Sequence, residues 1–295
     1  MVLQLYWKCG DSRFPIKERT TLAYADRSDK DEPSRTRRCD LGCAGLIRWR
    51  LLLKWPADES SEIGRRYGPN HEGGSHALMY ATYIFPRLMD WVLRSERFQA
   101  ERRQLLTSAR GMVLEIGFGT GLNLPHYPQA VTALHTVDPS PMLPHRVACR
   151  VAQTPFPVHI QRVSAEGLSY GDATFDCAVS TFTLCTIPDA VTALCEVRRV
   201  LKPEGRFLFL EHGRSDDSTI ATWQDRLNPI QNWFGCGCNL NRRIDQLIRE
   251  AGLQLDYVDR YVLSGVPRIG GEMYRGAALR HNDDPASIPP GHNST

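Results

Sequence analysis

No hydrophobic run in this chain of 295 residues approaches the roughly 20 residues that a membrane-spanning helix requires. The first residues, MVLQLYWKCGDSR, also lack the basic start, long apolar stretch and small-residue cleavage site of a secretory signal. The nine cysteines follow no repeating spacing, which favours reduced thiols over a disulfide framework. These absences together predict a cytoplasmic protein.

An excess of charge of one sign is also missing from most of the chain. Residues 1–75 hold 14 Lys and Arg against 11 Asp and Glu, which leaves 22 against 22 for residues 76–295. The net charge of +3 therefore belongs to the first segment. A balanced main segment has no strong electrostatic attraction for a polyanion, so we expect no nucleic-acid partner.

Three segments of the chain differ in composition. Residues 1–75 mix charged residues with Gly, Ser and Pro without a sustained helical or strand period, which predicts a largely irregular or disordered N-terminal extension. Residues 76–280 carry the periodic patterns of a folded domain, and residues 281–295 predict a disordered tail. Within the extension, Leu46–Pro56 interleaves apolar and basic residues. This stretch is interpreted either as a short interfacial helix in weak peripheral contact with a membrane, or as a helix packed on the domain or an unfolded extension.

Short β-type runs alternate with helical patterns through the middle of the chain. Runs such as MVLEIG, ALHTVD, FDCAVST and RFLFLEH are separated by helical segments such as PDAVTALCEVRRVL. This alternation predicts an α/β fold with a Rossmann-like, doubly wound and mostly parallel sheet. Two late runs, LQLDYVDRYVLS and MYRGAALRH, predict an antiparallel pair at the C-terminal edge of that sheet. Pro86 is expected to break or kink the helical pattern that begins near His76.

Three glycines follow the first of these β-type runs at a spacing of two residues. In VLEIGFGTGLN, Gly117, Gly119 and Gly121 come directly after a strand that contains Glu115. Glycine permits unusual backbone dihedral angles and lets a ligand lie against the main chain at the carboxyl end of a strand. A dinucleotide fingerprint, G-x-G-x-x-G, places its third glycine five positions after the first, whereas here it comes at four. The pattern indicates a ligand other than a dinucleotide, or a glycine-rich turn without a ligand.

An acidic residue ends the next β-type run. Asp138 stands about 20 residues after the glycines, where it is placed to accept hydrogen bonds from both hydroxyls of a ribose. The other interpretation is a helix cap, helped by the following Pro139. In the later loop SAEGLS, the small side chain of Ala165 leaves room for an adenine ring, and Glu166 is either a ligand contact or a solvated acid. These features follow successive strands, which predicts one shared binding site.

These motifs together resemble the class I S-adenosylmethionine-dependent methyltransferases, in particular the branch of the quinone C-methyltransferase and the thiol methyltransferase-like enzymes. The resemblance covers residues 76–280 and rests on VLEIGFGTGLNLPHYP, VDPSPML, SAEGLS, FDCAVSTFTLCTI, EVRRVLKPEGRFLFLEH and GCNLNR. It implies S-adenosylmethionine as the cofactor. The residues expected in the cofactor site are Glu115, Gly117, Gly119, Gly121, Asp138, Pro139, Ala165, Glu166 and Thr181.

The acceptor side offers fewer signals. Methyl transfer from a sulfonium is an in-line displacement, which requires alignment of the acceptor and exclusion of water. A thiol acceptor reacts as its thiolate, which a general base helps to form. In LFLEHG, His212 is the first candidate for this base, with Glu211 to orient it; the alternative is a histidine with structural hydrogen bonds. Tyr80 and Tyr83 are expected to pack in the core, or else to shape the acceptor pocket.

We expect no metal site. Cys236 and Cys238 combine with Cys39 and Cys43 only at the spacings C-x-C and C-x-x-x-C, which fit zinc poorly. The prediction is therefore an enzyme that moves a methyl group from S-adenosylmethionine to a small lipophilic or thiol acceptor. Two alternatives stay open, namely a phospholipid or quinone methyltransferase at a membrane surface and a non-catalytic module that binds the cofactor.

Overall fold

The protein is described by a computed structural model that covers residues 5–6, 21–22, 79–139 and 143–280. The short strands β1 (Leu5–Tyr6) and β2 (Thr21–Leu22) form an antiparallel pair. The expectations for the rest of the extension, for the Leu46–Pro56 stretch and for the C-terminal tail lie outside the described residues. No helix in the described ranges is both long and apolar enough to span a bilayer.

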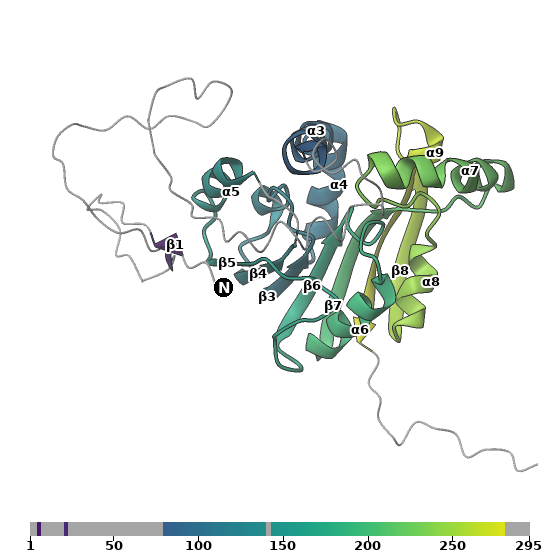
Figure 1. The fold of residues 1–295 in the computed structure, drawn as a ribbon. Helices are drawn as coiled ribbons and strands as arrows, with labels where there is room; N and C mark the ends of the chain where they lie inside the picture. Colours follow the sequence, from purple (N-terminus) through teal and green to yellow (C-terminus); the bar gives the residue numbers. More distant parts are fainter. Residues whose placement is uncertain (1–4, 7–20, 23–78, 140–142, 281–295) are drawn as a thin grey trace, which may run out of the picture.

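Seven strands form one sheet in the order β5-β4-β3-β6-β7-β9-β8 (Figure 1). Strands β3 to β7 are parallel to one another, whereas β9 runs antiparallel to both β7 and β8. The predicted doubly wound sheet with an antiparallel C-terminal edge pair is therefore confirmed. The strands are β3 (Gly111–Ile116), β4 (Val131–Val137), β5 (Val158–Gln161), β6 (Phe175–Thr181), β7 (Leu201–His212), β8 (Leu253–Val262) and β9 (Glu272–Arg280).

Helices connect the strands and cover both faces of the sheet (Figure 1). They are the π-helix η1 (Tyr80–Ile84), α3 (Phe85–Leu93), α4 (Glu96–Leu106), the 3-10 helix η2 (Leu124–His126), α5 (Pro144–Val151), α6 (Ala190–Val200), α7 (Ser218–Phe234), α8 (Ile244–Glu250) and α9 (Arg268–Gly271). Pro86 lies in the first turn of α3, directly after η1. It marks a boundary between two helical segments, because a proline lacks the backbone N–H that the interior of a helix needs.

The sheet is buried on both faces, as its apolar strands require. Successive residues of β7 point in opposite directions, so Phe207 and Phe209 belong to one core cluster and Leu208 and Leu210 to the other. The first cluster includes residues of α6 and α8, and the second includes residues of α4 and α5. This double packing fixes the strand ends, on which the candidate site is built.

Helix α7 is an element that the sequence patterns did not predict. It has 17 residues, of which only Ala221 and Gln224 are buried, and it contains Pro229. Its apolar residues therefore do not form the stripe by which an amphipathic helix is recognised. Asp217 caps the helix by accepting hydrogen bonds from the amides of Thr219 and Ile220. Helices α3 and α7 lie above the same end of the sheet (Figure 1).

Candidate active site

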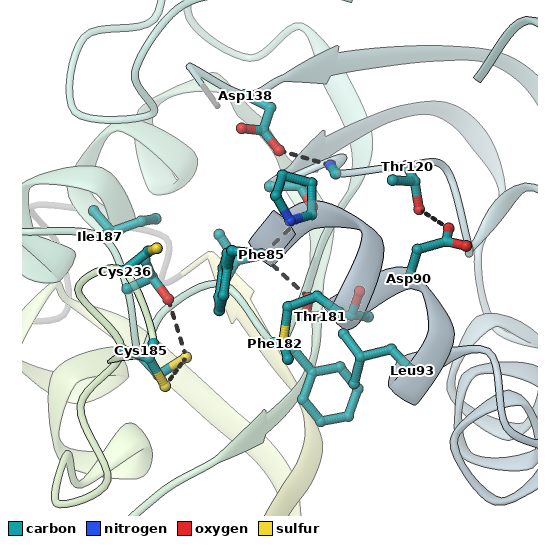
Figure 2. Close-up of a pocket in the computed structure, with 18 of the residues that line it drawn as sticks. Phe85, Asp90, Leu93, Thr120, Asp138, Thr181, Phe182, Cys185, Ile187 and Cys236 are labelled. Atoms are coloured by element: carbon teal, nitrogen blue, oxygen red, sulfur yellow. Dashed lines mark hydrogen bonds between the residues drawn. The ribbon is translucent and has the colours of Figure 1, made fainter. Parts of the chain in front are cut away.

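A cavity of about 720 Å³ opens at the carboxyl ends of the parallel strands. Its volume is within the range of roughly 300–1,000 Å³ that is usual for small-molecule sites. The ends of β3, β4, β6 and β7 contribute to its lining, together with residues of η1, α3 and α7. Figure 2 shows Asp138 at the top of this cavity and Cys185 at the lower left. The cavity therefore joins the predicted cofactor residues to a group of cysteines.

The glycine loop, residues 117–121, follows β3 directly. Gly117, Gly119 and Gly121 have φ angles of 75°, 55° and 78°, in the left-handed region that favours glycine. A Cβ atom at Gly117 would lie 1.9 Å from Oγ1 of Thr183, so the absence of a side chain is needed for packing there. A Cβ atom at Gly119 would meet no protein atom within 4 Å. Since Gly119 lines the cavity, its backbone is open to a ligand.

Asp138 follows β4 and lies beside the glycine loop. Its carboxylate accepts a hydrogen bond from the amide of Gly119 at 2.6 Å, and only 5% of the residue is exposed. Asp138, Pro139 and Ala165 all line the cavity. The structure thus brings together residues from three loops that the sequence assigned to one site.

A buried polar network lies beside the glycine loop. Glu115 accepts hydrogen bonds from Nδ2 of Asn123 at 2.9 Å and from the hydroxyl of Tyr127 at 2.8 Å. Arg102 of α4 donates to Oδ1 of Asn123 at 2.6 Å and to Oγ1 of Thr181 at 2.7 Å. Burial raises the pKa of Glu115 to about 7, although the hydrogen bond from Tyr127 and the charge of Arg102 act to lower it. Burial likewise lowers the pKa of Arg102 to about 10, against the charge of Glu115.

Arg102 is a candidate that the sequence analysis missed. Its side chain lines the cavity although only 3% of the residue is exposed. Its Nε is buried and has no hydrogen-bond partner within the described part of the chain. A guanidinium of this kind can bind a carboxylate group of a ligand. The available signal was its spacing from Leu105 and Leu106, which places an arginine on the buried face of α4.

Glu166, like Gly121, is an expected cofactor residue that does not line the cavity. Its carboxylate accepts hydrogen bonds from the hydroxyl of Ser164 at 2.7 Å and from the amide of Asp189 at 2.8 Å. It is absent from the lining of the cavity described above. Glu166 therefore joins its own loop to the start of α6, where Asp189 is the capping residue.

Glu211 and His212 are adjacent at the end of β7 but have different neighbours. Glu211 is fully buried and accepts hydrogen bonds from the hydroxyl of Ser180 at 2.7 Å and the amide of Thr183 at 2.9 Å. These bonds hold the turn after β6 in place. The carboxylate of Glu211 is thus engaged by that turn, whereas the sequence predicted that it orients the imidazole of His212. His212 lines the cavity, and its Nε2 lies 3.1 Å from Sγ of Cys238. Burial disfavours the imidazolium, but the electrostatic interaction and hydrogen bond with Cys238 and the charge of Glu211 outweigh this and raise the pKa of His212.

Two cysteines besides Cys238 line this end of the cavity, namely Cys185 and Cys236. Sγ of Cys185 lies 3.7 Å from Sγ of Cys238, and Cys236 also contributes to the lining. Figure 2 shows Cys185 and Cys236 on the same side of the cavity as Ile187. The combination with Cys39 and Cys43, whose spacing fits zinc poorly, lies outside the described residues.

Asp90 connects helix α3, which lines the cavity, to the neighbouring elements. This buried carboxylate pairs with Arg150 of α5 at 2.8 Å and with Arg146, and it accepts a hydrogen bond from the hydroxyl of Thr120 in the glycine loop. Burial disfavours its charge, but the hydrogen bonds from Arg150 and Thr120 and the charges of both arginines lower the pKa of Asp90. Asp90 thereby links α3, α5 and the glycine loop.

The two tyrosines of η1 have separate surroundings. Tyr80 lines the cavity, and its hydroxyl donates a hydrogen bond to the carbonyl of Phe234 at 2.9 Å, which ties η1 to α7. Tyr83 is 58% exposed, so the prediction that it packs in the core is wrong. A π-helix has more residues per turn than an α-helix, which turns this side chain away from the position that α-helical spacing predicts.

Comparison with known proteins identifies relatives of this chain by sequence. A methyltransferase domain family matches residues 114–209. Human thiol S-methyltransferase TMT1A is 31% identical over 163 residues, which cover 51% of this chain and 66% of that protein. Rat thiol S-methyltransferase TMT1B is 30% identical over 181 residues, covering 57% of this chain and 74% of that protein. A phosphatidylethanolamine N-methyltransferase of Cereibacter sphaeroides is 31% identical over 127 residues, covering 42% and 62% of the two chains.

The fold is also found among solved structures. A methyltransferase of Haloferax volcanii, solved in complex with the Trm112 methyltransferase activator, superposes with a TM-score of 0.52 at 15% identity. The superposition covers 68% of this chain and 96% of that chain. This likeness concerns the fold, whereas the matched domain and the relatives concern the sequence. Because both agree with the parallel sheet and its glycine loop, the chain belongs to the class I S-adenosylmethionine-dependent methyltransferases.

Proposed function

We propose that this enzyme transfers the methyl group of S-adenosylmethionine to a small thiol or other lipophilic acceptor by in-line displacement. One observation carries the proposal: a single cavity is lined by the glycine loop and Asp138 and also by the cysteines around His212. A donor and an acceptor bound in the same cavity can react without crossing bulk water. The human and rat relatives are thiol S-methyltransferases, which supports thiols as an acceptor class.

The cofactor is assigned to the half of the cavity around β3 and β4. There Asp138 is placed to accept hydrogen bonds from the ribose hydroxyls, and the open backbone of Gly119 lies alongside. Ala165 offers a small side chain to the adenine ring, and Arg102 offers a buried cation to the carboxylate of the methionine part. Thr181 and Glu115 support this half through their hydrogen bonds to Asn123.

The acceptor is assigned to the half of the cavity next to α7. A thiol must lose its proton before it attacks the methyl carbon, because the thiolate is the nucleophile. His212 is the imidazole at this end, and we assign it to thiolate formation, either as a base or together with the cysteines beside it. To act as a base, His212 must first break the contact between its Nε2 and Sγ of Cys238, which lie 3.1 Å apart. Glu211 contributes by holding the turn of Ser180 and Thr183.

A panel of acceptors tests this proposal. Purified full-length chain is incubated with S-adenosylmethionine and, separately, with alkyl thiols, quinols and phosphatidylethanolamine, and methylated products are detected by mass spectrometry. We expect transfer to at least one alkyl thiol. Transfer confined to protein or nucleic acid would refute a small-molecule acceptor.

A second candidate acceptor is a phospholipid or quinone taken from a membrane surface. Large apolar side chains are exposed on both helices that flank the cavity, with Trp91 of α3 exposed by 66% and Trp233 of α7 by 62%. Exposed tryptophans are enriched where proteins meet the polar region of a bilayer. The named substrate of the Cereibacter sphaeroides relative belongs to this class.

Vesicles distinguish the two candidates. For a membrane acceptor, activity should require vesicles, and the double variant Trp91→Ser with Trp233→Ser should lower it at least tenfold while leaving transfer to a water-soluble thiol unchanged. Equal activity of the double variant and the wild type on vesicles would exclude this use of the two helices.

A further inference from the structure

Three side chains with donor atoms suited to a soft metal meet at the acceptor end of the cavity. Cys185, His212 and Cys238, here called the thiol cluster, come from the turn after β6, the end of β7 and the loop between α7 and α8. One donor atom from each lies within 4.8 Å of the other two. All three residues line the cavity. Two cysteines and one histidine form a known set of three protein ligands for zinc with an open fourth position.

The separations in the thiol cluster approach those of a tetrahedral zinc site. Zn–S bonds of about 2.3 Å and Zn–N bonds of about 2.0–2.1 Å at tetrahedral angles place two sulfurs about 3.8 Å apart and a sulfur and a nitrogen about 3.6 Å apart. The sulfurs of Cys185 and Cys238 are 3.7 Å apart, and Nε2 of His212 is 3.1 Å from Sγ of Cys238. The sulfur–sulfur separation thus matches the tetrahedral value, the nitrogen is about half an ångström too close to Cys238, and the separation between His212 and Cys185 is within 4.8 Å.

The contacts that the thiol cluster makes without a metal are weak. A thiol is a poor hydrogen-bond donor and acceptor, so neither sulfur fully satisfies the imidazole of His212. Nδ1 of His212 is buried and has no hydrogen-bond partner among the described residues. Zinc bound at Nε2 would leave this Nδ1 without a partner, so the atom that a metal would satisfy is Nε2, whose present contact is a thiol.

Hydrogen bonds join the two segments that carry Cys185 and Cys238. The backbone amide and the Nδ2 of Asn239 both donate to the carbonyl of Cys185, at 2.9 and 3.0 Å. Arg242 donates to the carbonyl of Ile187 at 2.6 Å, and its positive charge interacts with both cysteines. The site is thus held in place by its surroundings, and a cation next to it compensates the charge of two thiolates.

We propose that Cys185, His212 and Cys238 bind a zinc ion whose fourth position faces the cavity and holds the acceptor as a thiolate. This inference rests on the proposed function for its substrate class. It replaces the expectation that no metal is bound, which was based on the spacings of Cys236 and Cys238 and of Cys39 and Cys43. It also assigns His212 as a ligand in place of a general base.

The chemistry of this site balances without an oxidant or a reductant. The acceptor thiol releases its proton to solvent when it coordinates zinc, because metal-bound thiols are deprotonated. A lone pair of its sulfur forms the new bond to the methyl carbon, while the bond from that carbon to the sulfonium breaks. The bonding electrons remain on the cofactor sulfur, which becomes the neutral sulfur of S-adenosylhomocysteine. The thioether product is uncharged and dissociates from zinc in exchange for the next thiol.

Zinc binding is measured on the full-length chain by competition with a chromophoric chelator, with a phosphine reductant present so that the cysteines stay reduced. We expect one zinc per chain in the wild type. Cys185→Ser and Cys238→Ser should weaken zinc binding by more than about 100-fold, since loss of residues behind the ligands alone costs about 10–100-fold. Cys195→Ser is the matched control, because Cys195 is an exposed cysteine outside the cluster, and it should bind zinc as the wild type does.

Thermal unfolding of each variant shows whether it is folded, and His212→Gln provides a third variant if one of the serine variants is not. A wild-type chain that binds no zinc, or a folded Cys238→Ser variant that binds it equally tightly, would overturn the site.

A second experiment tests the fourth position: cobalt replaces zinc, and hexanethiol is added. We expect the thiolate-to-cobalt absorption to increase as another sulfur coordinates, and an unchanged spectrum would overturn the role of the fourth position. Calorimetric titration of S-adenosylmethionine into the wild type reports separately on the proposed function.

Discussion

Substitution of Asp138 separates two tasks that one carboxylate performs. In the structure the carboxylate accepts a hydrogen bond from the amide of Gly119 at 2.6 Å, and it lines the cavity where the ribose is assigned. Asp138→Asn keeps an oxygen that can accept the Gly119 hydrogen bond but removes the negative charge. Asp138→Ala removes both. The pair therefore distinguishes loss of the loop contact from loss of the charge.

The expected magnitudes follow from these contacts. Charge-assisted hydrogen bonds to the ribose hydroxyls contribute about 2–3 kcal/mol together, which corresponds to a dissociation constant about 30–150-fold higher for Asp138→Ala. Asp138→Asn should lose about half of this free energy, since its oxygen still accepts one neutral hydrogen bond. The free energy of unfolding should fall by about 1 kcal/mol in Asp138→Ala through loss of the Gly119 bond, and by less in Asp138→Asn.

Calorimetric titration of S-adenosylmethionine gives the dissociation constants, and urea unfolding of the same samples gives the stabilities. Unchanged affinity in a folded Asp138→Ala variant would show that the ribose binds elsewhere. Affinity of Asp138→Asn equal to that of the wild type would show that the negative charge takes no part.

Three further predictions concern the glycine loop and the strand that precedes it. Gly119→Ala should lower the free energy of unfolding by only about 1–2 kcal/mol, the cost of a left-handed φ for alanine, because its Cβ meets no protein atom within 4 Å. It should nevertheless weaken S-adenosylmethionine binding at least tenfold, and an unchanged titration would place the ligand away from this loop. Gly117→Ala should destabilise more than Gly119→Ala in thermal unfolding, because its Cβ would lie 1.9 Å from Oγ1 of Thr183. Glu115 has a folded-state pKa of about 7 against an ordinary value of 4.5, so the folded protein binds the proton more tightly than the unfolded chain. The wild type should therefore lose about 3 kcal/mol of stability relative to Glu115→Gln as pH rises from 4.5 to 7, measured by urea unfolding at several pH values. A difference between these two proteins that does not vary with pH would show that Glu115 does not titrate in this window.

The sheet and the cofactor half of the cavity could be predicted because their signals are local. A strand, its glycine loop and the acid after the next strand each occupy a few consecutive residues, and the parallel order brings their carboxyl ends to one edge. Gly119 and Asp138 are therefore found together in the structure, joined by a hydrogen bond. Glu166 was less predictable, because the direction of a loop carboxylate depends on neighbours such as Asp189, which lies in a different segment.

The acceptor half depends on contacts between segments that are distant in sequence. Cys185 and Cys238 are separated by 53 positions, and their encounter requires the end of α7, which carries no clear apolar stripe. No spacing rule connects residues of a turn, a strand end and an inter-helix loop. Arg102 was missed for a related reason, since a charged helix is expected to face solvent until its buried neighbours are known.

The position of Asp90 has a consequence for how the walls of the cavity can move. Its carboxylate belongs to α3 but bonds to Thr120 of the glycine loop and to Arg150 of α5. Any movement of α3 away from the cavity would therefore break contacts to the glycine loop and to α5. Displacement of α3 and displacement of the glycine loop are thereby coupled through one buried carboxylate.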